Sequence, residues 1–250
     1  MMRVSAIQVS LQRGRCWGRI EDWVSEDIEL SILVDGRPYT TLTCSPKQLR
    51  ELAIGHLYTR GVLRSIQEVQ DIHVAGKGPR RICRLNLKAG VNVETGPERL
   101  VFRDSPTPPP NGPAVSPETI YRSVEGLSEV AEEFRRTGGV HVAALHAVGG
   151  GLVTYAEDVG RHNAVDKVVG YGVLNGVDFK GCFLVLSGRL SGEIVQKAGV
   201  AGISILASPS AATGSGVRAA LQMGITLIGF VRDGRMNIYT FPERVRLRKP

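Results

Sequence analysis

Residues 157–167 concentrate side chains that could bind a ligand. They read Glu-Asp-Val-Gly-Arg-His-Asn-Ala-Val-Asp-Lys, so acidic, basic and amide groups follow one another closely. The segment lies where an apolar strand is predicted to end near residue 156 and a helix to begin near residue 164. A helix N-terminus offers free N–H groups and the positive end of the helix dipole. This turn is therefore expected to bind a polar, anionic ligand.

Similar chemistry follows three further predicted strands, which end near residues 186, 207 and 230. In an α/β sheet, ligands bind at the carboxyl ends of the strands. Glycine lets backbone N–H groups approach a phosphate, and arginine offers a bidentate fork for phosphate oxygens. The candidate ligand-binding residues of the four turns are Asp158, Gly160, Arg161, His162, Asn163, Ser187, Gly188, Arg189, Ser208, Ser210, Thr213, Phe230 and Arg232.

Each turn also has a purely structural interpretation. Ser191 and Thr213 could be helix N-caps, and Arg189 and Arg232 could be solvated surface charges. His162 could be a capping or core histidine. The recurrence of four such turns on one predicted edge favours ligand binding over these separate explanations.

The elements that position the turns alternate between strand and helix. This alternation indicates an α/β layer whose sheet is partly parallel. The predicted strands are 141–148, 152–156, 183–186, 203–207, 225–230 and 236–239, and the predicted helices are 164–174, 192–198 and 216–223. The first half is expected to be strand-rich with one helix. Its predicted strands are 28–34, 39–43 and 82–87, and its helix opens at Ser45-Pro46.

The proline-rich segment 104–113 separates the two halves. It cannot form a helix or a central strand. We therefore expect a strand-rich domain over residues 1–112 and an α/β domain over 113–250. A helix with Ser116 as its N-cap is predicted to run to about Arg136, where Thr137-Gly138-Gly139 ends it.

Bulk composition sets the class of protein. The 42% hydrophobic and 22% charged fractions are those of a globular protein, and the net charge of +7 favours anionic partners or simply a basic surface. No signal peptide and no membrane span is recognised, so a cytoplasmic protein with free thiols is expected. Nucleic-acid binding is disfavoured because aromatic residues are only 6% of the chain and no basic run with interleaved aromatics occurs. His141 and His146 face opposite sides of one predicted strand, so they cannot readily share a metal.

The segment 157–167 resembles the signature of the FdhD family of formate dehydrogenase accessory proteins. The resemblance continues from about Glu21 to Val245 and is carried by further segments at 45–57, 137–145, 187–191, 224–232 and 237–240. It implies a cytidine-deaminase-like α/β fold with a mixed sheet and a tendency to dimerise. It also implies a role in maturing molybdenum- or tungsten-dependent formate dehydrogenases. Such proteins take persulfide sulfur from a cysteine desulfurase and deliver it to the bis-guanine-dinucleotide cofactor, of which GDP is a partial mimic.

One departure from the family concerns cysteine. The resemblance implies a sulfurtransferase-like sulfur carrier. The family's C-x-x-C loop corresponds to residues 104–113, which contain no cysteine, so the persulfide relay is not carried over residue by residue. Ser210-Ala211-Ala212-Thr213 also departs from the family's SAPT. No H-x-E or P-C-x-x-C motif is present to hold zinc. Cys44, expected beside a helix N-terminus, is the candidate persulfide carrier, although it could equally be a buried hydrophobe. Two functions stay open. One is a sulfur carrier for the molybdenum or tungsten cofactor, and the other is a chaperone that binds the cofactor and presents it to the formate dehydrogenase catalytic subunit without sulfur transfer.

Overall fold

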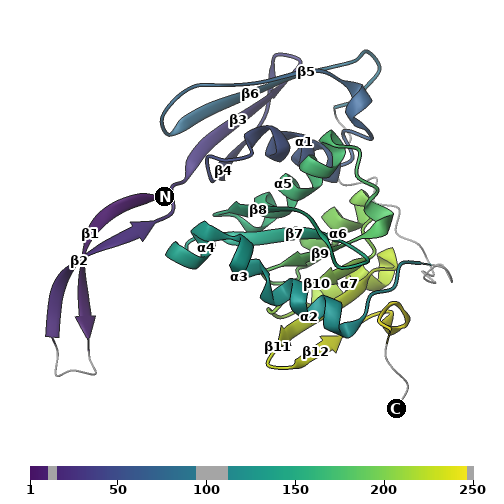
Figure 1. Ribbon diagram of the computed structural model, residues 1–250. Coiled ribbons are helices and arrows are strands. Elements are labelled where there is room, and N and C mark those ends of the chain that lie inside the picture. Colours follow the sequence, from purple (N-terminus) through teal and green to yellow (C-terminus); the bar gives the residue numbers. More distant parts are fainter. Residues whose placement is uncertain (11–15, 94–111, 247–250) are drawn as a thin grey trace.

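The computed structural model describes residues 1–10, 16–93 and 112–246 of the chain (Figure 1). The fold is mixed α/β, as the sequence predicts. Its main sheet has the strand order β12-β11-β10-β9-β7-β8. These strands are β7 (His141–Ala147), β8 (Leu152–Asp158), β9 (Cys182–Leu186), β10 (Ile205–Ala207), β11 (Thr226–Arg232) and β12 (Arg235–Ile238).

The direction of the strands places four carboxyl ends on one edge of this sheet. β9, β10 and β11 are mutually parallel, and β7 is antiparallel to both β9 and β8. β8 therefore runs in the same direction as β9, β10 and β11. Since all four strands end at the same edge, the four predicted turns share that edge, together with the amino end of β7.

Helices cover both faces of the main sheet, so its central strands are apolar on both sides. β9 shows this directly, because Leu184 and Leu186 belong to one core cluster and Phe183 and Val185 to the other. The first face carries α5 (Arg161–Leu174), α6 (Gly192–Ala201) and α7 (Gly214–Met223), and the second carries α2 (Pro117–Glu125) and α3 (Leu127–Val130), followed by α4 (Glu132–Thr137).

The amino-terminal half forms a four-stranded sheet and one helix. The sheet order is β4-β3-β6-β5. Its elements are β3 (Ile28–Val34), β4 (Arg37–Cys44), α1 (Leu49–Thr59), β5 (Val69–Ala75) and β6 (Arg80–Leu87). Short 3-10 helices lie at η1 (Ile66–Glu68), η3 (Phe179–Gly181) and η4 (Pro242–Arg244).

The two halves meet where α1 crosses α5. A side chain added at Gly55 would overlap the backbone carbonyl of Asp166, and one added at Gly170 would overlap that of Glu51. The two helices therefore approach more closely than any larger residue would permit. One hydrophobic core continues from the small sheet through α1 into α5 and α6. The expected domain boundary between residues 112 and 113 comes directly after residues 94–111, which lie outside the described residues.

A two-stranded ribbon projects from the body at the amino terminus (Figure 1). It consists of β1 (Met2–Ser10) and β2 (Cys16–Val24), paired antiparallel. Sequence analysis did not predict this ribbon or β5, because their alternation of apolar and polar residues is irregular. No helix among the described residues is both long and apolar enough to cross a membrane.

Two predicted helices differ from those observed. The helix expected over 116–136 is divided into α2, α3 and α4, with Ala131 in an extended conformation between the last two. The helix expected to open at Ser45 begins at Leu49 instead, after Gln48 in the left-handed region with φ 54°. Local propensity alone could not show either break, because alanine at 131 and glutamine at 48 both favour helix.

Candidate functional site

The four turns at the sheet edge contact one another directly. The Ser208 hydroxyl, after β10, donates a hydrogen bond of 2.8 Å to the Gly188 carbonyl, after β9. The backbone N–H of Phe230, near the end of β11, donates one of 3.0 Å to the Ser210 carbonyl. These bonds join neighbouring turns into a continuous rim, as expected from the parallel strands.

Arg161 lies against the turn after β9. A β-carbon built on Gly188 would lie 3.2 Å from the Arg161 Cβ and 3.4 Å from His141 Nδ1. Glycine at this position thus lets two cationic or polar side chains approach the backbone. Ser187 accepts a hydrogen bond of 3.0 Å from the Val142 N–H, and its hydroxyl lies 3.4 Å from His141 Nδ1. His141 was missed as a site residue, although its place at the start of an antiparallel strand could have brought it to this edge.

Three side chains at the starts of α5 and α6 carry buried polar atoms without a hydrogen-bond partner among the described residues. They are Arg161 Nε, His162 Nε2 and Ser191 Oγ. His162 Nε2 lies 3.2 Å from Glu193 Oε2, but the two groups lack the alignment of a hydrogen bond. Since buried polar groups are normally satisfied, such a concentration beside two helix N-termini makes this edge the candidate site for a polar ligand.

Both histidines at this edge are held toward the neutral form. Burial is the main cause that lowers the pKa of His141, and the nearby Arg161 charge lowers it further. Burial also lowers the pKa of His162, while Glu193 opposes this effect. Neutral imidazoles can both donate and accept hydrogen bonds. The edge therefore combines the permanent cation of Arg161 with two adaptable polar rings.

Asp158 does not contact either Arg161 or His162 through a described hydrogen bond. Its carboxylate is fully buried, pairs with Lys167 Nζ at 2.6 Å, and accepts the backbone N–H of Ser45 and of Gly160 at 3.0 and 2.8 Å. Asp158 therefore does not orient Arg161 or His162 through a hydrogen bond. Its charged partner is Lys167, which α5 brings to it from its second turn.

Asn163 also points inward. Its side-chain amide donates to Asp158 Oδ1 at 2.9 Å and to the Thr43 carbonyl at 2.8 Å. Lys167 completes the network by donating to the carbonyls of Ser45 and Glu157 at 3.2 and 3.1 Å. Asp158, Asn163 and Lys167 thus join the turn before α5 to the chain after β4.

A second buried polar cluster lies one turn along α5. Both carboxylate oxygens of Asp166 accept a hydrogen bond of 2.8 Å from Lys197 Nζ. Oδ1 also accepts one of 2.7 Å from the Thr59 hydroxyl, and Oδ2 lies 3.2 Å from His56 Nδ1. Burial alone would raise the pKa of Asp166, but the charge of Lys197 and the contact with His56 outweigh it and keep the pKa below its ordinary value. This cluster joins α1, α5 and α6 beneath the sheet edge.

The remaining predicted residues lie around the rim in different roles. Thr213 caps α7 by accepting the Gly216 N–H at 3.1 Å, so its structural interpretation is confirmed. Arg189 and Arg232 are exposed, and the Arg232 guanidinium lies 5.5 Å from the ring of Phe230. Phe230 itself has φ 52°, a strained conformation for a large side chain.

An open hollow of about 550 Å³ continues from the start of α5 toward the base of the ribbon. Its walls are Ser25, Asp27, Thr43, Gly139, Val159 and Gly160. Among the described residues, no group of three or more His, Cys, Asp or Glu side chains is placed to hold a metal ion.

Comparison with known proteins now identifies the group to which this architecture belongs. The family model described as the FdhD/NarQ family matches residues 25–246. The chain belongs to the FdhD/NarQ family.

Individual relatives of this family match nearly the whole chain. The chain is 35% identical to "Sulfur carrier protein FdhD" of Shouchella clausii, over 92% of each chain. It is 36% identical to the protein of the same name from Methanothermobacter thermautotrophicus, over 91% of this chain and 93% of that one. The crystal structure of a proposed formate dehydrogenase accessory protein from Desulfotalea psychrophila superposes with a TM-score of 0.82 and 25% identity, covering 98% of this chain and all of that one.

The cysteines of this family member differ from the expectation for a reactive thiol. Cys44 is fully buried and lies five residues before α1, not beside its N-terminus. Burial raises its pKa to about 12, with a further contribution from Asp158 that Lys167 opposes. Burial likewise raises the pKa of Cys83 to about 12 and raises that of Cys182. The segment 104–113 that replaces the C-x-x-C loop lies almost entirely outside the described residues.

Proposed function

We propose that this protein acts in the maturation of a formate dehydrogenase and that its sheet edge binds the guanine-nucleotide end of a molybdenum or tungsten cofactor. The single observation that carries the proposal is the concentration of unpartnered buried groups, Arg161 Nε, His162 Nε2 and Ser191 Oγ, beside two helix N-termini. Family membership supports a guanine dinucleotide as the ligand. Such a dinucleotide is also polar, anionic and long enough to follow a continuous rim.

The residues present at the edge suit such a group. Arg161 would pair with a phosphate, and the backbone N–H groups at the starts of α5 and α6 would add donors to it. Gly188 lets Arg161 and His141 lie close against the turn after β9. His141, His162 and Ser191 would hydrogen-bond sugar or base atoms. The bound cofactor would supply the redox-active metal for the client enzyme.

Sulfur delivery is the finer part of the family role. A carrier thiolate would attack the outer sulfur of the persulfide on a cysteine desulfurase, forming a new S–S bond and releasing the desulfurase cysteine as a thiolate. Burial raises the pKa of Cys44 and of Cys83 to about 12, so both thiols are held in the protonated, unreactive form near neutral pH. This supports the second function, a chaperone that presents the cofactor to the formate dehydrogenase catalytic subunit without carrying sulfur.

Calorimetric titration with GDP tests the binding site. The wild-type protein is expected to bind GDP, and Arg161→Ala is expected to lower the affinity by about 1.5–3 kcal/mol, the range for a hydrogen bond to a charged group. Arg80→Ala is the matched control, because Arg80 is 84% exposed on the other sheet. Absence of binding by the folded wild type, or equal affinities in all three proteins, would contradict the proposal.

Mass spectrometry separates the two functions. After incubation with a cysteine desulfurase and cysteine, the chaperone function predicts no persulfide on any cysteine, and brief treatment with limiting iodoacetamide should label Cys44 slowly. A stable persulfide on Cys44 would establish the sulfur-carrier function instead. A persulfide on Cys16, Cys83 or Cys182 would contradict both versions.

A further inference from the structure

Strand β8 forms a free edge of the main sheet. It is the last strand in the sheet order and, within the described residues, pairs only with β7. The Tyr155 carbonyl accepts a hydrogen bond of 3.3 Å from the Gln48 side chain, so the backbone groups of Tyr155 point away from β7. The Tyr155 N–H points the same way and has no hydrogen-bond partner in the described part of the chain. An edge with unpaired backbone groups can add a further strand.

A hollow of about 450 Å³ runs beside this edge and leaves room for such a strand. Its walls are Lys47, Gln48, Leu152, Val153, Thr154, Tyr155 and Glu157. Leu152 and Tyr155 are 44% and 36% exposed, so apolar surface borders the unpaired backbone groups. The Gln48 amide already bonds to the edge carbonyl as a peptide N–H would. Backbone groups and apolar surface together are what strand addition of an extended peptide requires.

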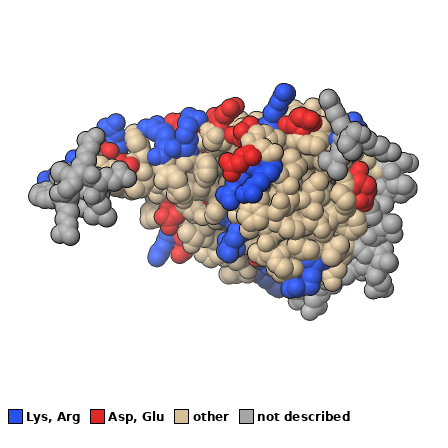
Figure 2. Space-filling view, turned by 90° about the horizontal axis from the view of Figure 1, so that it is seen from below, with Lys and Arg blue, Asp and Glu red and all other residues tan. Residues whose placement is uncertain are grey.

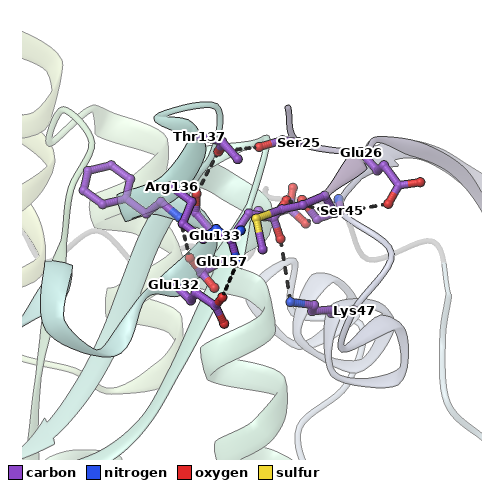
Figure 3. Close-up of polar contacts among 12 residues, drawn as sticks. Ser25, Glu26, Ser45, Lys47, Glu132, Glu133, Arg136, Thr137 and Glu157 are labelled. Atoms are coloured by element: carbon purple, nitrogen blue, oxygen red, sulfur yellow. Dashed lines mark hydrogen bonds and ion pairs between the residues drawn. The ribbon is translucent and has the colours of Figure 1, made fainter. Parts of the chain in front are cut away.

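Acidic side chains gather at one end of the hollow. Glu133 is 2% exposed, and its Oε1 atom has no hydrogen-bond partner among the described residues. Burial is the main cause that raises the pKa of Glu157, the Phe134 N–H opposes it, and the Glu133 charge raises the pKa further. Lys47 Nζ lies 3.7 Å from Glu133 Oε2, beyond hydrogen-bond distance (Figure 3). These two carboxylates therefore share one loosely placed lysine.

The neighbouring charges leave this acidic excess in place. Arg136 pairs with Glu132 at 2.9 Å, and the Met1 amino group lies 3.1 Å from Glu26 and 4.0 Å from Glu133. The chain as a whole has a net charge of +7, and Figure 2 shows acidic and basic side chains interspersed on the face that it presents. A local excess of carboxylates beside an open hollow is complementary to a cationic side chain.

We infer that β8 and the hollow beside it bind an extended segment of a partner protein by strand addition, and that this segment carries a lysine or arginine that reaches Glu157 and Glu133. A backbone N–H of the segment replaces the Gln48 amide at the Tyr155 carbonyl, and a carbonyl of the segment accepts the Tyr155 N–H. A second copy of β8 fits less well, because Leu152–Asp158 contains no cation. This interface does not depend on nucleotide binding at the other sheet edge.

Fluorescence anisotropy with short peptides tests the charge preference. In antiparallel pairing, a labelled KTVTV peptide places its central valine opposite Tyr155 and its lysine beside Glu157. The full-length protein should bind KTVTV at least tenfold more tightly than ETVTV, whose glutamate would meet two carboxylates. Glu157→Gln should weaken KTVTV binding and reduce the discrimination between the peptides. Glu125→Gln, at an exposed position on α2, is the matched control and should behave as the wild type.

Proline substitution tests the strand addition itself. Tyr155→Pro removes the outward N–H but no hydrogen bond to β7, and proline is tolerated on edge strands. This variant should bind KTVTV at least tenfold more weakly than Tyr155→Ala, which loses the same side chain but keeps the N–H. Urea denaturation verifies that both variants are folded. N-methylation of the central valine of the peptide blocks the matching bond from the other side and should weaken binding to the wild type to a similar extent.

Three results would overturn the inference. They are an absence of KTVTV binding by the folded wild type, equal affinity for KTVTV and ETVTV, and full affinity for KTVTV in Tyr155→Pro together with full affinity of the N-methylated peptide. Sedimentation velocity covers the other occupant of the edge. Self-association of the free protein that Tyr155→Pro abolishes would assign the β8 edge to a second copy and would likewise overturn the inference.

Discussion

The first turn of α5 and the turns that follow it differ in the hydrogen bonding of their buried polar groups. Arg161 and His162, in the first turn, carry buried nitrogen atoms without hydrogen-bond partners, whereas Asp166 and Lys167 make every contact their buried groups require. One sequence motif therefore has two tasks. Its upper part, Arg161 and His162, leaves donors available for a ligand. Its lower part, Asp166 and Lys167 together with Asp158, holds the helix and both sheets in place.

This division gives the buried charges of the motif a structural role. The Asp158–Lys167 pair joins β8 and α5 to the chain after β4, and the Asp166–Lys197 pair joins α5 to α6. Both pairs thus fix the start of α5, where Arg161 and His162 lie. A ligand site built on this helix is preorganised, because its supporting contacts are made before the ligand arrives.

Breaking the lower part of the motif should have the largest effect. Lys167→Met removes one partner of a fully buried ion pair and leaves Asp158 as an uncompensated charge. We expect a loss of about 3–5 kcal/mol in the free energy of unfolding, measured by urea denaturation. Lys77→Met, at an exposed lysine between β5 and β6 with no ion pair to a described residue, is the control and should cost no more than about 0.5 kcal/mol. Equal small losses in both variants would show that the buried pair does not support the fold.

Changing the upper part should separate binding from stability. The Arg161 Nε has no hydrogen-bond partner in the described part of the chain, so Arg161→Ala removes few internal contacts. We expect the free energy of unfolding to change by less than about 1 kcal/mol while the affinity for GDP falls by about 1.5–3 kcal/mol. Arg189→Ala, at an exposed position of the neighbouring turn, completes the series and should also weaken binding. If Arg161→Ala destabilised the protein as strongly as Lys167→Met, the proposed division of the motif would fail.

Acidic pH should expose the cost of burying neutral histidines. Burial lowers the pKa of His146, His141 and His162 in the folded protein, so below about pH 6.5 the unfolded chain binds more protons than the folded one. The contribution of these histidines to the free energy of unfolding is therefore fully present above that pH. It decreases as the pH falls, by at most about 1.4 kcal/mol per pH unit for each proton.

His146→Gln tests this pH dependence at a buried histidine away from the site. His146 contacts Ser123 and stacks on Phe183. The slope of unfolding free energy against pH between 5 and 7 should become shallower in this variant. His73→Gln, at an exposed histidine, should leave the slope as in the wild type. A steeper slope in His146→Gln would reverse the assigned sign.

The sequence predicted that the four turns share one sheet edge, but not which of their side chains point into the protein. Apolar strands followed by glycine, serine and arginine correctly indicated four turns on one side of a partly parallel sheet, because strand direction follows from the alternation of strands and helices. Sequence spacing could not show that Asp158 and Asn163 turn inward while Arg161 stays at the rim. Those directions depend on Lys167 and on the Thr43–Ser45 segment, which lies more than a hundred residues away along the chain.

Other features escaped prediction for similar reasons. Cys44 precedes a helix that begins later than its Ser-Pro signal suggested, and the left-handed Gln48 that delays it has no sequence mark. His141 reached the site only through antiparallel pairing of β7 with β9. The β1–β2 ribbon lies before the residues that the family model matches, and its strands have no covering helix to give them a regular pattern.

A crystal structure of the protein with GDP tests the central claim most directly. We expect density for the nucleotide phosphates beside Arg161 and the turn at Gly188, within hydrogen-bond distance of the N-termini of α5 and α6, and a polar ligand atom on Ser191 Oγ or His162 Nε2. Asp158, Asp166 and Lys167 should keep their present partners and make no contact with the nucleotide. GDP bound at another surface, or bound through a Lys167–Asp158 pair that has opened, would contradict the division of the motif into a supporting part and a binding part.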